Sequence, residues 1–204
     1  MVDALGTYET AVGSQTRSLP IVPLNDDLAI ALLITVDHGV AFSARAGEDL
    51  AKLLSPFAVD VVVSVATMGI PLAIEASRAL GLDDYVILQK TPKIHLADAV
   101  SEPVRSITTD SRQRLLFDRA RVGAVTGKRV ALIDDVVSTG ASVRAALDLV
   151  RRVGGEPVAI GALLTEAAAW RATLDEDAGL VQSLGAVPLF RRQPDGAMRE
   201  DWGG

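Results

Sequence analysis

The chain has 204 residues, enough for one domain with a substantial core, and its content of 49% hydrophobic but only 4% aromatic residues indicates an aliphatic core. It has no cysteine, which excludes disulfides and thiolate metal sites, and its two histidines do not suffice for a histidine-rich zinc site. A net charge of -6, the absence of a membrane-length apolar run and the lack of a signal-peptide pattern lead us to expect a soluble cytoplasmic protein without nucleic-acid or membrane partners.

Strands and helices are predicted to alternate along the chain. Residues 1–18 are polar and rich in Gly, Ser and Thr, and we expect them to be loosely held. The pattern then predicts a strand at 27–36, a helix at 41–57, a strand at 59–66, a helix at 72–81, strands at 84–90 and 128–135, a helix at 141–155 and a strand at 156–166. Such units make right-handed crossovers, so the fold class is α/β, with a central mostly parallel sheet flanked by helices.

The segment from residue 91 to 127 interrupts this alternation. It is too long for an ordinary connection, and residues 104–109 and 113–118 resemble two short strands that would form a projecting hairpin. From Lys90 to Arg121 there are seven basic and four acidic residues, so the local charge opposes that of the whole chain. The segment is either a solvated hairpin or an arm that faces an anion.

Two adjacent acids follow a buried apolar strand and precede a small-residue loop. Asp134 and Asp135 are placed at the carboxyl end of that strand, where open parallel sheets bind ligands. The loop from Ser138 to Ser142 leads into a helix, whose free N–H groups and dipole suit a phosphate. Carboxylates suit sugar hydroxyls or water on a metal, so the arrangement predicts a ribose 5-phosphate site. The alternative is an ordinary strand end with Ser/Thr helix capping.

The stretch ALIDDVVSTGAS, residues 131–142, resembles the phosphoribosyl-pyrophosphate (PRPP) signature of type I phosphoribosyltransferases. SVATMGIP at 64–71 resembles the pyrophosphate-binding loop of the family, and LQKTPK at 88–93 resembles the start of its mobile catalytic loop. SITTDSRQRLLFDRARV at 106–122 resembles the hairpin of the adenine and xanthine branch. LLTE, ending at Glu166, resembles the closing strand of that branch. The resemblance implies a single domain, 1–204, with its core at about 28–170 and a small hood from about 17–45, from 171–204, or from both.

The reaction implied by the resemblance is displacement of pyrophosphate from C1 of PRPP by a purine nitrogen, with Mg²⁺ as cofactor and purine salvage as its role. The expected partners are PRPP and a purine base, and the expected assembly is a homodimer through the hairpin region. Catalysis would consist of positioning and of stabilising the departing diphosphate.

The resemblance assigns a role to each motif. The residues expected to be catalytic are Asp134, Asp135, Lys90 and Lys93, with Mg²⁺ held by PRPP and through water by the two aspartates. The residues expected to bind the 5-phosphate are Ser138, Thr139, Gly140, Ala141 and Ser142. The residues expected to bind pyrophosphate are Ala66, Thr67, Met68, Gly69, Arg112 and Arg114. For the two arginines, simple surface charge is an equal alternative, and so is action across a dimer interface.

The choice of base is open at this point. In the hypoxanthine-guanine type an aspartate stands where this chain has Ser138, and a serine is no general acid-base at neutral pH. This favours adenine and leaves xanthine open. The aromatic candidates for stacking on a base are Phe42, Trp170, Phe190 and Trp202, although ordinary packing is the favoured role for each of them.

A non-catalytic regulator is the alternative from a different class. SVATMGIP and the hairpin also resemble the PRPP-sensing repressors of purine operons, but those carry an N-terminal DNA-binding winged helix that we do not find before residue 28. Two other features are dismissed. GAVTGKR at 123–129 has the wrong spacing for a nucleotide P-loop and is expected to be a turn, and His95 is expected to face solvent.

Overall fold

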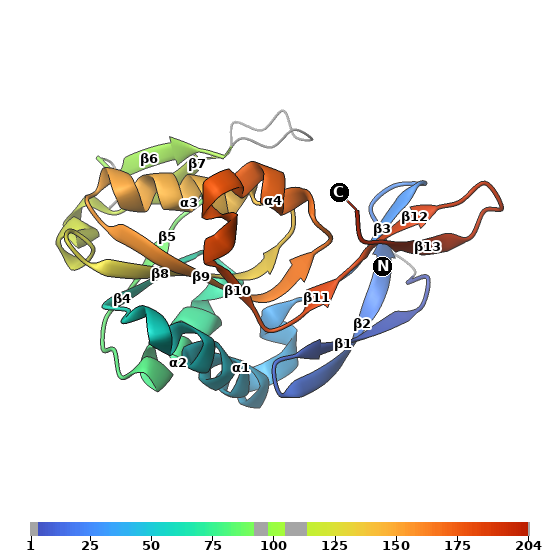
Figure 1. Cartoon of the computed structure of the whole chain (residues 1–204), viewed down its shortest axis with the longest axis horizontal. Helices are drawn as coiled ribbons and strands as arrows, with labels where there is room; N and C mark the ends of the chain where they lie inside the picture. Colours follow the sequence, from blue (N-terminus) through green and yellow to red (C-terminus); the bar gives the residue numbers. More distant parts are fainter. Residues whose placement is uncertain (1–3, 92–97, 105–113, 204) are drawn as a thin grey trace.

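A computed structural model of the chain describes residues 4–91, 98–104 and 114–203. Its main body is a parallel sheet with helices on both faces, and a smaller antiparallel sheet stands beside it (Figure 1). The predicted α/β class, with a mostly parallel sheet flanked by helices, is therefore confirmed. None of the described helices is both long and apolar enough to cross a bilayer.

The central sheet has the strand order β10-β9-β8-β4-β5, and β11 also pairs with β9. Its strands are β4 (Val61–Val65), β5 (Tyr85–Leu88), β8 (Arg129–Val137), β9 (Glu156–Glu166), β10 (Val181–Ser183) and β11 (Ala186–Val187). All the pairings within it are parallel. All five residues of β4 are buried, which explains why the strand is apolar throughout instead of alternating.

Helices cover the two faces of this sheet (Figure 1). The helices on one face are α1 (Gly39–Leu54) and α2 (Gly69–Leu80), and those on the other are α3 (Ala141–Arg152) and α4 (Ala169–Leu174). Short 3₁₀ turns are η1 (Thr35–His38), η2 (Ser55–Phe57), η4 (Arg119–Ala124) and η5 (Asp175–Leu180). Each face has its own aliphatic core: Leu147 and Leu149 are fully buried on the α3 side, and Leu50 and Leu72 on the α1 side.

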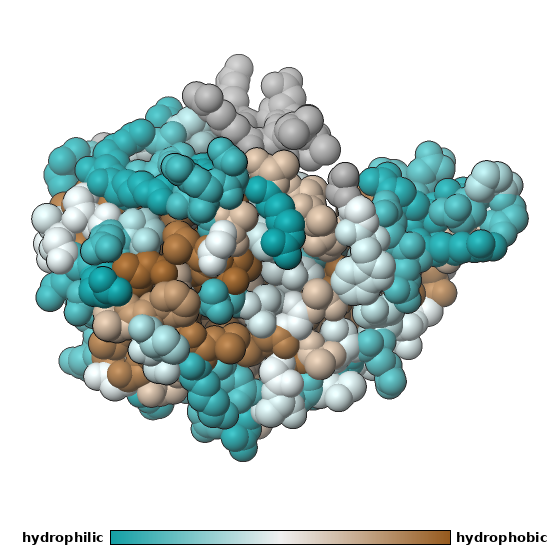
Figure 2. Space-filling view, in the orientation of Figure 1, coloured by the Kyte–Doolittle hydropathy of each residue, from teal (hydrophilic) through white to brown (hydrophobic). Residues whose placement is uncertain are grey.

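The second sheet joins the two ends of the chain. It has the order β1-β2-β3-β12-β13. Its strands are β1 (Thr7–Val12), β2 (Gln15–Pro23), β3 (Leu28–Ala31), β12 (Leu189–Arg192) and β13 (Met198–Asp201). Leu19 and Phe190 of this sheet belong to the core on the α1 side, so the sheet is packed onto the body. Figure 2 shows that the projecting end of this sheet is covered by hydrophilic residues.

Two predictions about the N-terminal region are wrong. Residues 7–18 are not loosely held, because they form β1 and the first part of β2, paired around a turn at Gly13 and Ser14. Only residues 28–31 of the strand predicted at 27–36 are a strand, and that strand joins the second sheet. The first error has a physical reason. β1 and β2 each keep one face in solvent, so alternate residues are polar, and the composition of the segment resembles that of a loop.

The predicted hairpin exists, with its first strand earlier than expected. β6 (Val100–Pro103) pairs antiparallel with β7 (Arg114–Phe117), which matches the predicted second strand. Residues 105–109 of the predicted first strand lie outside the described part of the chain. The backbones of Gln89 and Leu116 exchange hydrogen bonds of 3.0 and 2.8 Å, which ties the hairpin to the chain leaving β5.

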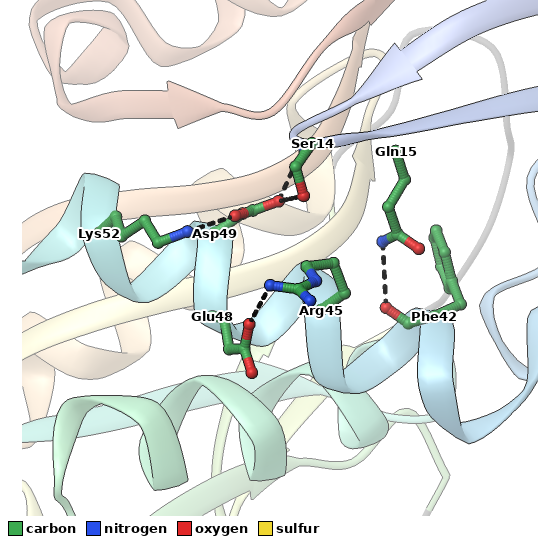
Figure 3. A network of polar contacts seen from close by, with 7 residues as sticks. All are labelled: Ser14, Gln15, Phe42, Arg45, Glu48, Asp49 and Lys52. Atoms are coloured by element: carbon green, nitrogen blue, oxygen red, sulfur yellow. Dashed lines mark hydrogen bonds and ion pairs between the residues drawn. The ribbon is translucent and has the colours of Figure 1, made fainter.

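A buried aspartate on α1 holds the β1–β2 turn against the body (Figure 3). Asp49 is 7% exposed and accepts hydrogen bonds from the Ser14 amide at 2.8 Å, the Ser14 hydroxyl at 2.6 Å and the Lys52 ammonium at 2.8 Å. Gly13 has a φ of 60°, and a Cβ there would lie 2.6 Å from the Asp49 carboxylate, so only glycine allows this approach. The second sheet is thereby fixed to α1 by polar as well as apolar contacts.

We predict that Asp49→Asn destabilises the protein by about 2 kcal/mol near neutral pH. Burial raises the pKa of Asp49, but the hydrogen bonds from Lys52 and Ser14 outweigh it and lower the pKa to about 2. A depressed pKa adds stability above the pKa of the unfolded state, so wild-type stability should fall as the pH drops from about 4 toward about 2. Urea denaturation of both proteins across this range measures the effect.

The matched control is Glu48→Gln, one residue away. Its carboxylate pairs only with Arg45, and both side chains are more than half exposed. Exposed ion pairs contribute little, so this variant should stay within about 0.5 kcal/mol of wild type. Equal losses in the two variants would show that Asp49 has no special role in holding the turn.

Candidate active site

The loop after β8 runs directly into the N-terminus of α3. Gly140 stands at the N-cap position with a φ of 79°, a left-handed value that favours glycine, and no side chain caps the helix. A Cβ at Gly140 would meet the Thr173 Cβ and the Trp170 carbonyl at 3.2 Å, so the loop also packs closely on α4. The Thr139 hydroxyl makes only a long contact of 3.4 Å with the Ala141 amide, and the amides of Ser142 and Val143 have no partner in the described part of the chain, so the start of α3 can bind an anion.

This loop lines a cavity of about 160 Å³ together with residues from two other places in the chain. Asp134 and Asp135 line it from β8, and Lys90 lines it from the segment that follows β5. The rest of the lining comes from residues 136–143. The structure thus brings together the predicted acid pair, the predicted phosphate loop and one predicted catalytic lysine.

The acid pair lies inside β8 and not at its end. β8 pairs with β4 only as far as Ile133, but it remains paired with β9 as far as Val137, because β9 is the longer neighbour. The predicted end of this strand at Asp135 is therefore two residues short. Asp134 and Asp135 stand just beyond the end of β4, where their carboxylates can face a ligand at the carboxyl edge of the sheet.

The two carboxylates strongly influence each other. Burial, followed by the negative charge of Asp135, raises the pKa of Asp134 to about 8, and the nearby Lys90 ammonium acts in the opposite direction. Burial and the charge of Asp135 thus both disfavour ionisation of Asp134. A bound cation would favour the fully ionised pair, because it would offset their repulsion.

The donor set at this site fits a Mg²⁺ that arrives with a diphosphate substrate. No three His, Asp or Glu side chains within residues 4–91, 98–104 and 114–203 gather into a protein-only metal site. Mg²⁺ is commonly held by one or two carboxylates, substrate phosphates and water, which matches a pair of aspartates beside a phosphate loop. Asp134 and Asp135 are the residues that would hold it, directly or through water.

The second predicted loop lies beside the first. Residues Ala66–Met68 follow β4, and α2 begins at Gly69 with no side-chain cap. The peptide bond between Ala66 and Thr67 is cis. A Cβ at Gly69 would lie 2.1 Å from the Ser64 hydroxyl and 3.4 Å from the Ile133 carbonyl, so this helix start is pressed against the strand that carries the acid pair. Two uncapped helix N-termini therefore meet at one edge of the sheet.

The remaining predicted site residues are Arg114, Lys93 and Arg112, of which the structure describes only Arg114. Arg114 is exposed at the start of β7 and does not line the cavity. Lys93, His95 and Arg112 lie outside the described part of the chain, so their predicted roles are untested.

The four aromatic candidates for base stacking divide into core and surface. Phe42, Trp170 and Phe190 are at most 5% exposed and belong to the apolar cores, so packing accounts for them. Trp202 is 48% exposed, and its indole donates to Glu200 at 3.0 Å.

The sequence prediction missed one residue beside the site. Glu166, the last residue of β9, is 7% exposed, and its carboxylate accepts a hydrogen bond from the Ser138 hydroxyl. Burial raises the pKa of Glu166, while the hydrogen bond from Ser138 lowers it. The available signal was a glutamate that ends an otherwise apolar strand, at the same edge of the sheet as the acid pair.

Comparison with known proteins identifies the family. The model of the phosphoribosyl transferase domain matches residues 43–183, more than half of the chain. The chain belongs to this family. The predicted family, fold and class of enzyme are confirmed: the chain is a phosphoribosyltransferase.

The individual relatives share only low sequence identity with this chain. Xanthine phosphoribosyltransferase of Laribacter hongkongensis is 26% identical over 146 residues, which cover 71% of this chain and 76% of the relative. The purine biosynthesis transcriptional repressor PurR of Bacillus subtilis is 28% identical over 121 residues, 59% of this chain and 41% of the repressor. Adenine phosphoribosyltransferase of Saccharomyces cerevisiae, solved with adenine and an imino-altritol bisphosphate, has a TM-score of 0.62 at 16% identity and covers 88% of this chain and 94% of its own. These likenesses support the fold and the family and leave the base undecided.

We predict that Gly69→Ala loosens the site and lowers stability by about 1–3 kcal/mol. The new methyl group would displace the buried Ser64 hydroxyl, which donates to the Ile133 carbonyl at 2.6 Å. Thermal unfolding measures the loss. Gly123→Ala is the control, because a Cβ there has open space around it.

The double variant Ser64→Ala/Gly69→Ala tests whether the loss in Gly69→Ala comes from a clash of the new methyl group with the Ser64 hydroxyl. Removing the hydroxyl makes room for the methyl group, so the double variant should be more stable than the sum of the single losses predicts. Strictly additive losses would contradict the close approach of Gly69 to Ser64.

Proposed function

We propose that this phosphoribosyltransferase transfers the 5-phosphoribosyl group of PRPP to a purine base and releases pyrophosphate, as a step of purine salvage. The observation that carries the proposal is the single cavity in which Lys90, the acid pair and the uncapped loop of α3 meet. Each of these groups matches one part of PRPP.

The phosphate and ribose ends of PRPP are assigned first. The amides and hydroxyls of residues 138–142 would bind the 5-phosphate at the start of α3, where the helix dipole favours an anion. Asp134 and Asp135 would accept hydrogen bonds from the two ribose hydroxyls. When bound, Mg²⁺ would supply positive charge to the diphosphate.

The pyrophosphate end is assigned to the neighbouring loop. The backbone of residues 66–69 leads into the uncapped start of α2, which suits an anion for the same reason as α3. Lys90 would add a cation between the two anion sites. Lys93, Arg112 and Arg114 keep their predicted roles in pyrophosphate binding and loop closure as proposals. Closure would exclude water from the reacting carbon, which is prone to hydrolysis.

Adenine is the favoured base, and xanthine is the second candidate. The relative from Laribacter hongkongensis is a xanthine enzyme, whereas the similar solved structure from yeast is an adenine enzyme. The second sheet, built from residues 7–31 and 189–201, is the proposed hood over the base. A PRPP-sensing regulator remains the alternative from another class, because a repressor is also among the relatives.

We predict that the wild-type protein, given PRPP and Mg²⁺, forms nucleotide from one of adenine, xanthine, hypoxanthine and guanine. Asp134→Asn/Asp135→Asn should lower kcat/KM by on the order of a hundredfold or more, since the carboxylates position the ribose and the cation. Chromatographic detection of nucleotide and pyrophosphate measures both.

The control for this assay is Asp83→Asn/Asp84→Asn. These two aspartates are likewise adjacent in sequence, but they are exposed and stand before β5, at its amino end and away from the cavity. Its activity should match wild type. If the wild-type protein binds PRPP in a calorimeter but turns over none of the four bases, the enzyme assignment to purines fails and the regulator is favoured.

We also propose a homodimer, and we predict twice the chain mass of 21.4 kDa in sedimentation equilibrium. The family resemblance is the reason to propose the contact at the hairpin. An apolar surface elsewhere is the other candidate for the contact. Val36 and Val40, which are 48% and 81% exposed, line a pocket there together with Ile70, Pro71 and Ile74. Val40→Asp leaves the dimer intact if the hairpin makes the contact and yields a monomer if this face does.

A further inference from the structure

A buried carboxylate without a cationic partner stands next to the candidate site. Glu166 forms no ion pair with any Lys, Arg or His in the described part of the chain, and the Ser138 hydroxyl donates to it. Burying a carboxylate is costly unless it is paired, so such a group more often serves a site than the fold. Nothing in the roles assigned so far uses it.

The backbone fixes Glu166 at the junction of the two sheets. β11 pairs with Thr165 and Glu166, and the amide of Ala167 donates to the Val187 carbonyl at 2.9 Å. Two residues beyond Val187 the chain enters β12 of the second sheet. Glu166 is therefore paired with the strand that leads into the proposed hood, and the Ser138 hydroxyl joins its carboxylate to the PRPP cavity.

Ser138 connects this carboxylate to the cavity. The Ser138 side chain lines the cavity, and its hydroxyl proton is directed to Glu166. A hydroxyl has one proton to donate, so the free lone pairs of Ser138 Oγ are left for a ligand. A phosphate oxygen is an acceptor and carries negative charge, so it is a poor partner for this Oγ. A ligand with an N–H group is a good partner.

We propose that Ser138 and Glu166 act together as the acceptor for the ring N–H of the base, with Glu166 as the positioning residue. This rests on the proposed function and moves Ser138 from the 5-phosphate group to the base side of the site. Thr139, Gly140, Ala141 and Ser142 keep the phosphate.

The chemistry of transfer needs such an acceptor. One imidazole nitrogen of a neutral purine bonds to C1 of the ribose as the bond from C1 to the pyrophosphate oxygen breaks, and that oxygen takes the electron pair. The other imidazole nitrogen carries the N–H, whose proton becomes acidic as the ring loses electrons. That proton passes to Ser138 Oγ while the Ser138 proton passes to Glu166, so one proton leaves the base and one is gained by the carboxylate. A serine alone cannot do this at neutral pH, but a serine backed by a carboxylate can.

The test compares Ser138→Ala, Glu166→Gln and the double variant with wild type, using PRPP, Mg²⁺ and the base that wild type accepts. Each single variant should lower kcat/KM for the base by about tenfold or more, since a hydrogen bond to a charged group is lost. The double variant should lose little more than either single one, because the two residues act as a unit. Ser138→Thr keeps a hydroxyl and should retain most of the activity.

Calorimetric titration with PRPP distinguishes this role from a structural one. The affinity of Glu166→Gln and Ser138→Ala for PRPP should stay within about twofold of wild type, with unchanged melting temperatures. The proposal would be overturned by unchanged turnover in Glu166→Gln. It would also be overturned if PRPP binding weakened as much as turnover of the base, or if the losses of the two single variants multiplied in the double variant. If wild type turns over no base, the proposed function fails, and this inference falls with it.

Discussion

The hydrogen bond from the Ser64 hydroxyl to the Ile133 carbonyl joins the two strands on which the site depends. It links β4 to β8 at the point where their pairing ends, directly below the acid pair and the start of α2. Since Gly69 packs against the same hydroxyl, the helix start, the strand and the acid pair hold one another in place. Parallel strands end at one edge of the sheet, and this contact fixes how close two of their loops can come.

Charge is distributed unevenly across the cavity, and the proposed chemistry follows that distribution. Two uncapped helix N-termini and Lys90 provide positive potential for the phosphate groups. Asp134 and Asp135 line the same cavity, where burial and the charge of Asp135 raise the pKa of Asp134. On the far side of the loop, Glu166 supplies a negative group behind Ser138. Phosphate oxygens and base N–H groups would thus meet opposite sides of one short loop.

The second sheet is attached to the body by both polar and apolar contacts. Asp49 holds the β1–β2 turn, while Leu19 and Phe190 enter the core on the α1 side. β11 pairs with the end of β9 beside Glu166, and it leads directly into β12 of the second sheet.

The sequence by itself determined the features that arise from neighbouring residues. The apolar run of β4, the extent of β9 and the acid pair with its loop were predicted, because local periodicity and a contiguous motif specify them. The tertiary structure alone decided the rest. β1 and β2 expose alternate residues to solvent, so their composition resembles a loop until they pair. Lys90 joins the acid pair, and Glu166 joins Ser138 across 28 residues of chain, only because parallel strands place their ends side by side.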